Sequence, residues 1–172
     1  MKSTRTARPQ RAAAPPLPEF EVLDRTHREA LQMLKAFEAL LAHLNDNGPD
    51  EIAQASAQRI IAFFNGPGRT HHADEEKLVF PPLLASTDVE LVQNVRRLQQ
   101  DHGWLEEDWR ELSPQVEAIA KGYNWYDLTM LRLALPVFTA LYNEHIALEK
   151  SLVYPEAKRR RLAELHGREA KS

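Results

Sequence analysis

The sequence of 172 residues contains no cysteine. This absence excludes disulfide bonds, thiolate metal sites and catalysis by a thiol, and it suits a protein of the reducing cytoplasm. A bound metal ion must therefore be held by histidine and carboxylate side chains, which are common ligands of zinc, manganese and non-haem iron.

Long apolar runs and a strong charge of one sign are absent as well. No stretch approaches the ~18 uninterrupted apolar residues of a membrane-spanning helix. The first residues are basic but no apolar segment follows them, so we do not expect a secretory signal. The formal net charge of −3 and the pI near 6.2 give no support for nucleic-acid binding. We therefore expect no membrane partner and no nucleic-acid partner.

Alternation of apolar and polar residues, the pattern of half-buried β-strands, is not sustained anywhere, and the apolar residues instead recur with helical spacing. This spacing marks four segments, at about residues 20–44, 50–81, 86–121 and 124–154. Four helices joined by short connections predict an all-α, up-down-up-down four-helix bundle.

Glycine and proline positions add detail to these segments. The stretch 65–68 should break or bulge the second segment, and Thr70 could cap a fresh turn after it. Pro114 suggests a kink or restart in the third segment, and Pro136 a kink in the fourth.

The two ends of the chain differ from the bundle, which we expect at residues 19–156. Residues 1–18 contain four prolines and are expected to form an extended or disordered arm. Residues 157–172 form a basic C-terminal tail that opens with Lys158 and three arginines. The simplest interpretation of such a charge run is a solvated helix end.

One histidine from each segment falls at a common level. His27 and His71 lie 21 and 23 residues from the glycine of the first turn, and His102 and His145 lie 20 and 23 residues from that of the last. At ~1.5 Å of rise per helical residue, all four fall within about one turn of each other along the bundle. We therefore expect one inward-pointing histidine per helix.

The two halves of the chain also repeat each other. Residues 71–81 align with residues 145–155 without a gap, and His, Ala, Glu, Leu, Val, an aromatic residue and Pro coincide. In each half a His and a Glu stand four residues apart, on one helix face. This register pairs Glu75 with Glu149 and competes with a register based on His72 and Glu76.

Four imidazoles and two carboxylates at one level are a metal-ligand set. A carboxylate has two oxygens and can bridge two ions about 4 Å apart. A histidine-rich set without sulfur suits iron best, with manganese and zinc as alternatives.

These motifs resemble the hemerythrin-like HHE cation-binding domain over residues 20–155. The motifs that carry the resemblance are Thr26-His27, His71-His72-Ala73-Asp74-Glu75-Glu76-Lys77-Leu78-Val79-Phe80-Pro81, Asp101-His102 and Glu144-His145-Ile146-Ala147-Leu148-Glu149. The resemblance implies a four-helix bundle with two non-haem iron ions, which handles dioxygen, nitric oxide, peroxide or iron itself. It also implies a set of metal ligands: His27, His71, Glu75, His102, His145 and Glu149.

Two departures from oxygen-carrying hemerythrins argue against dioxygen transport. Those proteins have a further histidine one turn after the third-helix ligand, where this chain has Glu106, and their last carboxylate follows its histidine by five residues instead of four. His72 could restore a fifth imidazole if the second segment is distorted enough to turn both neighbouring histidines inward.

The other polar and aromatic side chains considered are not expected to bind metal. Glu76 and Glu106 are expected to be solvated or to lie behind a ligand, while Asp101 and Glu144 are expected to be exposed, unless they bond the second nitrogen of a ligand histidine. Surface positions are predicted for His43 and His166, and core positions for Phe63, Trp104, Trp109 and Leu141.

The leading functional hypothesis is a cytoplasmic di-iron protein that binds, senses or detoxifies a small oxidant, namely dioxygen, peroxide or nitric oxide. An alternative is an iron-responsive or iron-holding interaction protein whose bundle is ordered by metal. A third, weaker hypothesis is a purely structural bundle. The sequence leaves open whether the protein is an enzyme and whether it forms a homodimer.

Overall fold

The computed structural model describes residues 16–171, and these form helices and short connections without any strand. The predicted N-terminal arm lies almost wholly outside the described residues. The helical elements are α1 (Pro18–Asn47), α2 (Glu51–Asn65), α3 (Pro67–Asp74), the π-helical η1 (Glu75–Val79), α4 (Phe80–Leu84), α5 (Val89–Ala120), α6 (Leu128–Leu148), the π-helical η2 (Glu149–Val153) and α7 (Tyr154–Glu169). The prediction of an all-α four-helix fold is confirmed.

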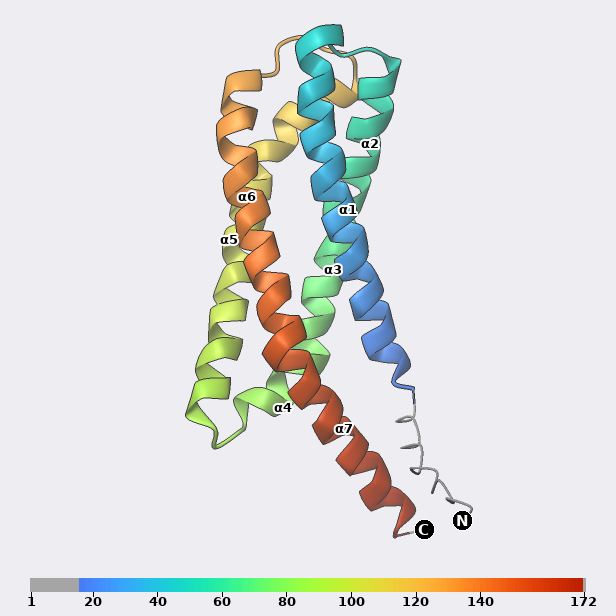
Figure 1. Cartoon of the computed structure of the whole chain (residues 1–172), viewed down its shortest axis with the longest axis vertical. Coiled ribbons are helices and arrows are strands. Elements are labelled where there is room, and N and C mark those ends of the chain that lie inside the picture. The colour runs from blue at the N-terminus through green and yellow to red at the C-terminus, as the bar shows by residue number, and fades with distance from the viewer. Residues whose placement is uncertain (1–15, 172) are drawn as a thin grey trace, which may run out of the picture.

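Four long segments make the bundle, because α2 continues through α3, η1 and α4, and α6 continues through η2 and α7 (Figure 1). Helix α1 contacts α2, α2 contacts α5, α5 contacts α6, and α6 contacts α1. The turn between α1 and α2 lies at the same end as the turn between α5 and α6, and the turn from α4 to α5 lies at the other end.

Aspartate caps start three of the segments where the sequence predicts a start. The carboxylates of Asp50, Asp88 and Asp127 accept hydrogen bonds from the backbone N–H three residues later, at 2.9, 3.1 and 2.9 Å. Such a bond satisfies one of the four N–H groups that have no partner in the first turn of a helix.

The predicted break at residues 65–68 is present and lies between α2 and α3. A Cβ atom on Gly66 would lie 2.8 Å from the carbonyl oxygen of Ala62, so this tight step requires glycine. Asn65 accepts a hydrogen bond from the indole N–H of Trp109 at 2.8 Å, which holds the break against α5. Helix α3 then begins at Pro67, three residues earlier than the cap expected at Thr70.

Both interior prolines lie inside continuous helices. Helix α5 runs through Pro114 to Ala120, so a restart of the helix at that point is wrong. Helix α6 likewise runs through Pro136 to Leu148.

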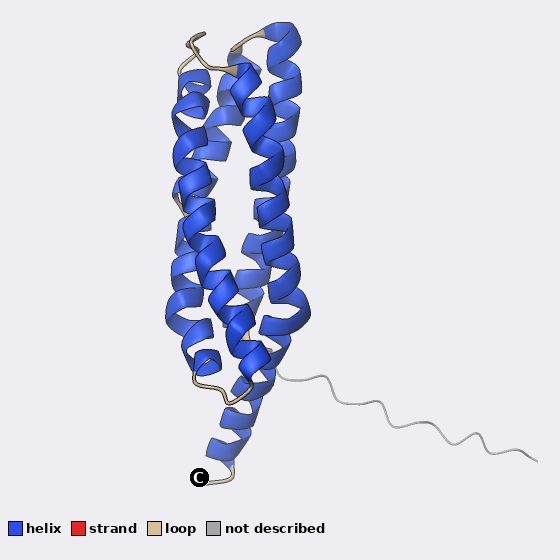
Figure 2. Cartoon of the chain, turned by 90° about the vertical axis from the view of Figure 1, so that its left-hand side faces the viewer, coloured by secondary structure: helices blue, strands red, loops and turns tan. Residues whose placement is uncertain are grey.

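The basic segment near the C-terminus is helical. Helix α7 continues beyond the expected end near residue 154 as far as Glu169 and projects past the α4–α5 turn (Figures 1 and 2). Glu156 pairs with Arg159 and Arg160 at 2.7 and 2.8 Å, and these two guanidinium groups lower the pKa of Glu156 to about 2. The charge run thus lies along an exposed helix.

Two apolar clusters fill the bundle, and the buried polar residues lie between them. The larger cluster, cluster 1, packs the ends of the helices near the α1–α2 turn and includes Phe37, Ile60, Leu112 and Phe138. The smaller cluster, cluster 2, packs the opposite end; it consists of Leu17, Phe20, Leu23, Val79, Phe80, Leu83, Leu91, Val95, Leu98, Val153, Tyr154 and Ala157.

The predicted core residues are buried with one exception. Phe63 and Trp109 are buried in cluster 1, and Leu141 packs against it. Trp104 is 49% exposed, so its assignment to the core is wrong. No helix among residues 16–171 has the length and apolar character needed to span a bilayer.

Candidate metal centre

Seven buried polar side chains form a layer across the bundle between the two clusters. They come from α1, α3, η1, α5, α6 and η2, and each is at most 8% exposed: His27, His71, Glu75, Asp101, His102, His145 and Glu149. Six of them are the histidines and glutamates singled out from the repeat, which the structure brings together. Burial of so many polar groups requires strong partners, because each would otherwise be solvated by water.

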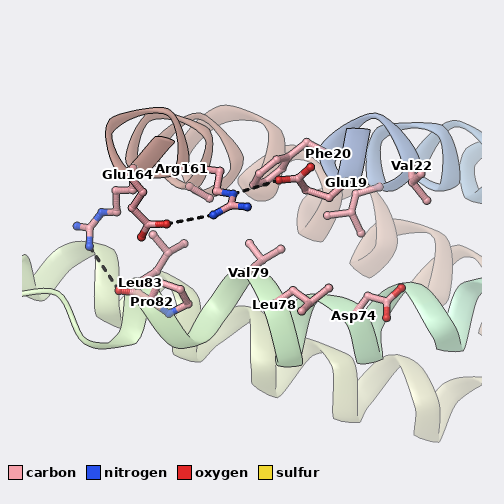
Figure 3. Close-up of a pocket in the computed structure, with 13 residues that line it drawn as sticks. Glu19, Phe20, Val22, Asp74, Leu78, Val79, Pro82, Leu83, Arg161 and Glu164 are labelled. Carbon is pink, nitrogen blue, oxygen red and sulfur yellow. Dashed lines mark hydrogen bonds and ion pairs between the residues drawn. The ribbon is translucent and has the colours of Figure 1, made fainter. Parts of the chain in front are cut away.

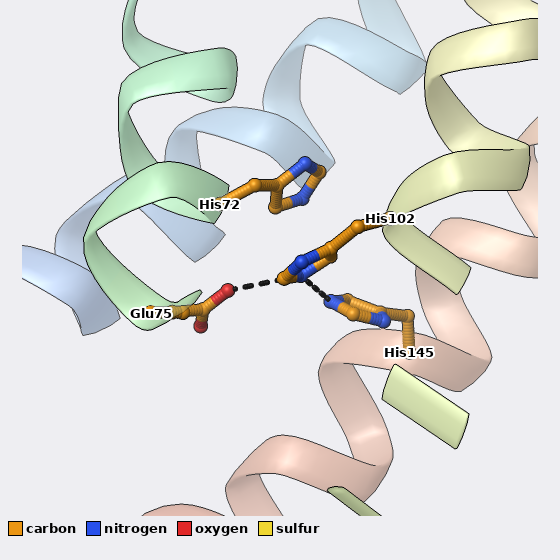
Figure 4. Close-up of side chains that lie close together, drawn as sticks. All are labelled: His72, Glu75, His102 and His145. Carbon is orange, nitrogen blue, oxygen red and sulfur yellow. Dashed lines mark hydrogen bonds and ion pairs between the residues drawn. The ribbon is translucent and has the colours of Figure 1, made fainter. Parts of the chain in front are cut away.

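One group of possible ligands joins His72, Glu75, His102 and His145 (Figure 4). One ligand atom from each of these side chains lies within 4.8 Å of all the others. The Nε2 atom of His102 is 3.2 Å from Glu75 Oε2 and 3.2 Å from His145 Nε2. We call this group position A.

A second group, position B, joins His27, His71, Glu75 and Glu149 under the same limit. His71 Nε2 is 3.2 Å from Glu75 Oε1, and His27 Nε2 is 2.8 Å from Glu149 Oε2. Glu75 is therefore common to both positions.

Both carboxylates reach from one position to the other. Glu75 directs Oε1 toward His71 in position B and Oε2 toward His102 in position A. Glu149 directs Oε2 toward His27 in position B and Oε1 toward His145, at 3.0 Å, in position A. This is the arrangement that two carboxylates need to bridge a pair of cations.

The two glutamates begin the two π-helical turns, which sequence reasoning did not predict. In each half the backbone N–H of the aromatic residue bonds the carbonyl of the glutamate five residues earlier, namely Phe80 to Glu75 and Tyr154 to Glu149. Pro81 and Pro155 follow directly; a proline has no N–H and its ring clashes with the carbonyl four residues earlier, which favours a wider turn. The proline shared by the two repeats was the available clue.

His72, which the sequence left open as a ligand, is one of the four possible ligands of position A. Its ring stacks on His102, with the centroids 4.1 Å apart, and lies 5.9 Å from the ring of Tyr142. Burial, followed by the nearby charge of His102, holds the pKa of His72 well below its usual value. His72 is therefore neutral, as a metal ligand must be.

Two acidic side chains lie behind the ligand histidines. His102 donates from Nδ1 to Glu76 at 2.9 Å, and Gln99 donates to the other oxygen of Glu76 at 2.7 Å. This bond places the free Nε2 of His102 toward position A. Asp101 is buried, with Oδ2 3.5 Å from His145 Nδ1, so of the two positions left open by the sequence it takes the one behind a ligand histidine.

The remaining acidic residues and histidines that the sequence singled out lie at or near the surface. Glu106 forms an ion pair with Arg69, and Glu144, 68% exposed, pairs with Arg97 at 3.4 Å. His43 is half-buried and pairs with Asp50 at 2.8 Å, and His166 is exposed on α7.

The chemistry of the layer fits bound cations. Several buried nitrogen and oxygen atoms that could ligate a cation have no hydrogen-bond partner. They include His71 Nε2, Glu75 Oε2 and both carboxylate oxygens of Glu149. Burial and the nearby charge of Glu75 raise the pKa of Glu149 well above its usual value. Burial alone would raise the pKa of Glu75, but the neighbouring imidazoles of His102 and His71 hold it well below its usual value. Two cations would neutralise both carboxylates and satisfy the free donor atoms.

Tyr154 is a site residue that sequence reasoning missed, because the repeat alignment treated it only as an aromatic counterpart of Phe80. Its ring stacks on His27 with centroids 5.2 Å apart, and Phe80 stacks in the same way on His102 at 5.5 Å. The Tyr154 hydroxyl also donates a hydrogen bond to Glu75 Oε1.

Only small voids border the layer. One, of about 10 Å³, lies against His27, His71, His72 and His145, with Phe63, Tyr142 and Ile146 among its apolar walls. That volume is about one water-sized sphere. The site therefore has room for a ligand of a few atoms.

A larger groove of about 550 Å³ lies outside the polar layer. It is formed by the start of α1, the continuous segment of α3, η1 and α4, and α7 (Figure 3). Its lining is mostly apolar, and three of its charged side chains pair with one another, since Arg161 forms ion pairs with Glu19 at 3.4 Å and Glu164 at 3.3 Å. The groove contains none of the buried histidines, so we place the functional site in the polar layer.

The chain belongs to the hemerythrin family, described as the hemerythrin HHE cation binding domain, whose model matches residues 19–157. It is also similar to a protein of Haemophilus influenzae named only as an uncharacterized protein, with 28% identity over 133 residues that cover 77% of this chain and 75% of the relative. No solved structure matches the chain. Membership implies metal-cation binding, and the two His/Glu groups are where such binding fits.

Proposed function

We propose that the chain binds two non-haem iron ions, one in position A and one in position B, and that this centre binds, senses or detoxifies a small oxidant such as dioxygen, peroxide or nitric oxide. The observation that carries the proposal is the placement of Glu75 and Glu149 between two groups of imidazoles. Manganese and zinc are alternative ions for the same ligands. A cytoplasmic location is part of the proposal.

Iron would supply redox chemistry and an open coordination position for the oxidant. The chain's own residues would then hold and shield the ions. Position A offers three imidazoles and position B two, with Glu75 shared, and Glu76 keeps the ring of His102 in the orientation that ligation needs.

The small void beside four of the histidines supports a ligand of diatomic or peroxide size. Its apolar walls, which include Phe63 and Ile146, would keep bulk water and larger organic molecules away.

The alternative function is an iron-holding interaction protein that is ordered by its metal. One observation favours it: the polar layer separates clusters 1 and 2 and takes ligands from all four long segments of the bundle. Metal would then tie the two halves of the core together and present an ordered surface to a protein partner. A homodimer remains a prediction.

Anaerobic loading with iron(II), followed by metal analysis, tests the proposal. We expect two irons per chain and a visible spectrum that changes on mixing with dioxygen, peroxide or nitric oxide. An iron content no higher than trace would refute both functions. If iron binds but the visible spectrum does not change with any of the three oxidants, the result would favour the iron-holding function.

Neighbouring glutamates provide a matched pair of variants. Glu75→Ala should lower the iron content strongly, because the shared ligand of both positions is lost. Glu76→Ala should keep two irons but bind them roughly 10- to 100-fold more weakly, the usual effect of losing a group that orients a ligand histidine. A greater loss of iron in Glu76→Ala than in Glu75→Ala would contradict the assignment.

A further inference from the structure

The two halves of the chain depart from their repeat at two places where a side chain reaches position A or position B. His72 aligns with Ile146, and Tyr154 aligns with Phe80. His72 adds an imidazole to position A, while Tyr154 brings its hydroxyl to position B. The two positions are therefore chemically unequal, although the backbone around them is repeated.

The Tyr154 hydroxyl lies where a cation in position B would bind. Its oxygen is hydrogen-bonded to Glu75 Oε1 and is 3.4 Å from His27 Nε2, and these two ligand atoms are 3.9 Å apart. Tyr154 is 1% exposed, and its ring is held between His27 and Phe20, at 5.2 and 5.7 Å between centroids. The hydroxyl is thus a fixed neighbour of position B.

We propose that Tyr154 is a positioning residue that makes position B the second to fill. Resting on the proposed two-ion function, the inference adds an order of binding. A cation that binds in position B must displace the hydrogen bond that the Tyr154 hydroxyl donates to Glu75 Oε1. A cation in position A would instead bind Glu75 Oε2, which has no hydrogen-bond partner. The hydroxyl stays protonated throughout and acts only as a hydrogen-bond donor to Glu75.

The repeat itself supplies the variant with the best expected fit. Tyr154→Phe places in the second half the residue that the first half already has at the equivalent position, packed on the equivalent histidine. Only the hydroxyl is lost. Tyr126→Phe is the matched control, because Tyr126 packs against cluster 1 and belongs to neither position.

Titration of the metal-free protein with cobalt(II), followed by its visible absorption, measures both steps. In the wild type we expect two separate steps. In Tyr154→Phe the second step should tighten by about tenfold or more, the ratio expected when one hydrogen bond to a charged oxygen no longer has to be displaced. The first step should not change, and Tyr126→Phe should leave both steps as they are.

The near-ultraviolet tyrosine band of the wild type gives a second measurement that needs no variant to fold. It should change with the second equivalent of cobalt(II) and not with the first, and Tyr154→Phe should lose this change. A tyrosine change with the first equivalent, or an unaltered second step in a folded Tyr154→Phe, would overturn the proposed order while two-ion binding stood. Failure of the wild type to bind cobalt(II) would instead count against the proposed function.

Discussion

Glu149 has a raised pKa, and its effect on stability can be tested in the metal-free protein. Its pKa is raised by burial and by the charge of Glu75. The folded state therefore keeps a proton on Glu149 at pH values where the unfolded state, with a pKa near 4.5, has lost it. By linkage, this residue's contribution to the free energy of unfolding falls as the pH rises from about 4.5 through the raised value.

Glu149→Gln cannot titrate and should lack that fall. Without metal, we expect the variant to gain stability relative to the wild type as the pH rises above about 4.5. Urea unfolding in the presence of a chelator at pH 5 and pH 8 measures the difference. Glu144→Gln removes an exposed carboxylate from the same segment and should show no such trend; a gain that is equal at both pH values would contradict the raised pKa.

At the scale of single residues, the sequence predicted the His and Glu side chains that occur in both halves of its repeat. The spacing of His71 and Glu75, echoed by His145 and Glu149, was enough to bring both pairs into the layer. The repeat could not decide whether His72 points into the bundle as His71 does, because the side chains of neighbouring residues on a regular helix point ~100° apart. Both histidines lie in the α-helical α3, and they enter different positions, His71 position B and His72 position A.

The π-helical turns are the elements that link sequence to site most directly. Each begins at a glutamate of the layer and ends two residues before a proline, Pro81 in the first half and Pro155 in the second. Pro155→Ala restores an N–H and removes a ring clash, so the turn can return to regular α-helical winding. Glu149 would then rotate away from the other ligands.

We therefore expect Pro155→Ala to stabilise the metal-free protein, by up to about 3 kcal/mol, while weakening metal binding. Chelator-dependent thermal unfolding and metal titration measure the two effects. Pro136→Ala is the control, since Pro136 lies in a regular α-helical part of the same segment and far from the ligands in sequence. Equal effects of the two substitutions on metal affinity would show that η2 does not position Glu149.

Three helix starts were predictable because each rests on a local signal, the aspartate that caps it, as at Asp88 and Asp127. Helix α7 was not, because a proline in the first turn and a dense run of charge resemble an end. Its continuation depends on tertiary contacts instead: Lys158 pairs with Asp24 of α1 at 3.1 Å, and Arg160 reaches Ser86 at 2.8 Å.

On the scale of the whole molecule, the polar layer divides the core. Clusters 1 and 2 each contain residues from several helices, and the layer between them has buried donor atoms that lack partners. Such a layer weakens the link between the two halves unless cations bind there, because unpaired buried polar groups oppose folding.

Metal should therefore change how the protein unfolds as well as how stable it is. Bound ions stabilise only the folded state, so the melting temperature should rise on loading and unfolding should be a single transition. Without metal, the smaller cluster 2 should open before cluster 1. Hydrogen exchange should then lose protection around Leu91, Val95 and Leu98 while the helix around Ile60 stays protected.

Glu75→Ala, incubated with the same metal, should exchange like the metal-free wild type, because the ligand common to both positions is missing. Uniform protection of the two clusters in the metal-free protein would show that the layer holds the bundle together without cations. Protection that differs between the clusters, and becomes equal only when metal is added to a chain with Glu75, would show that the centre couples the two halves of the core.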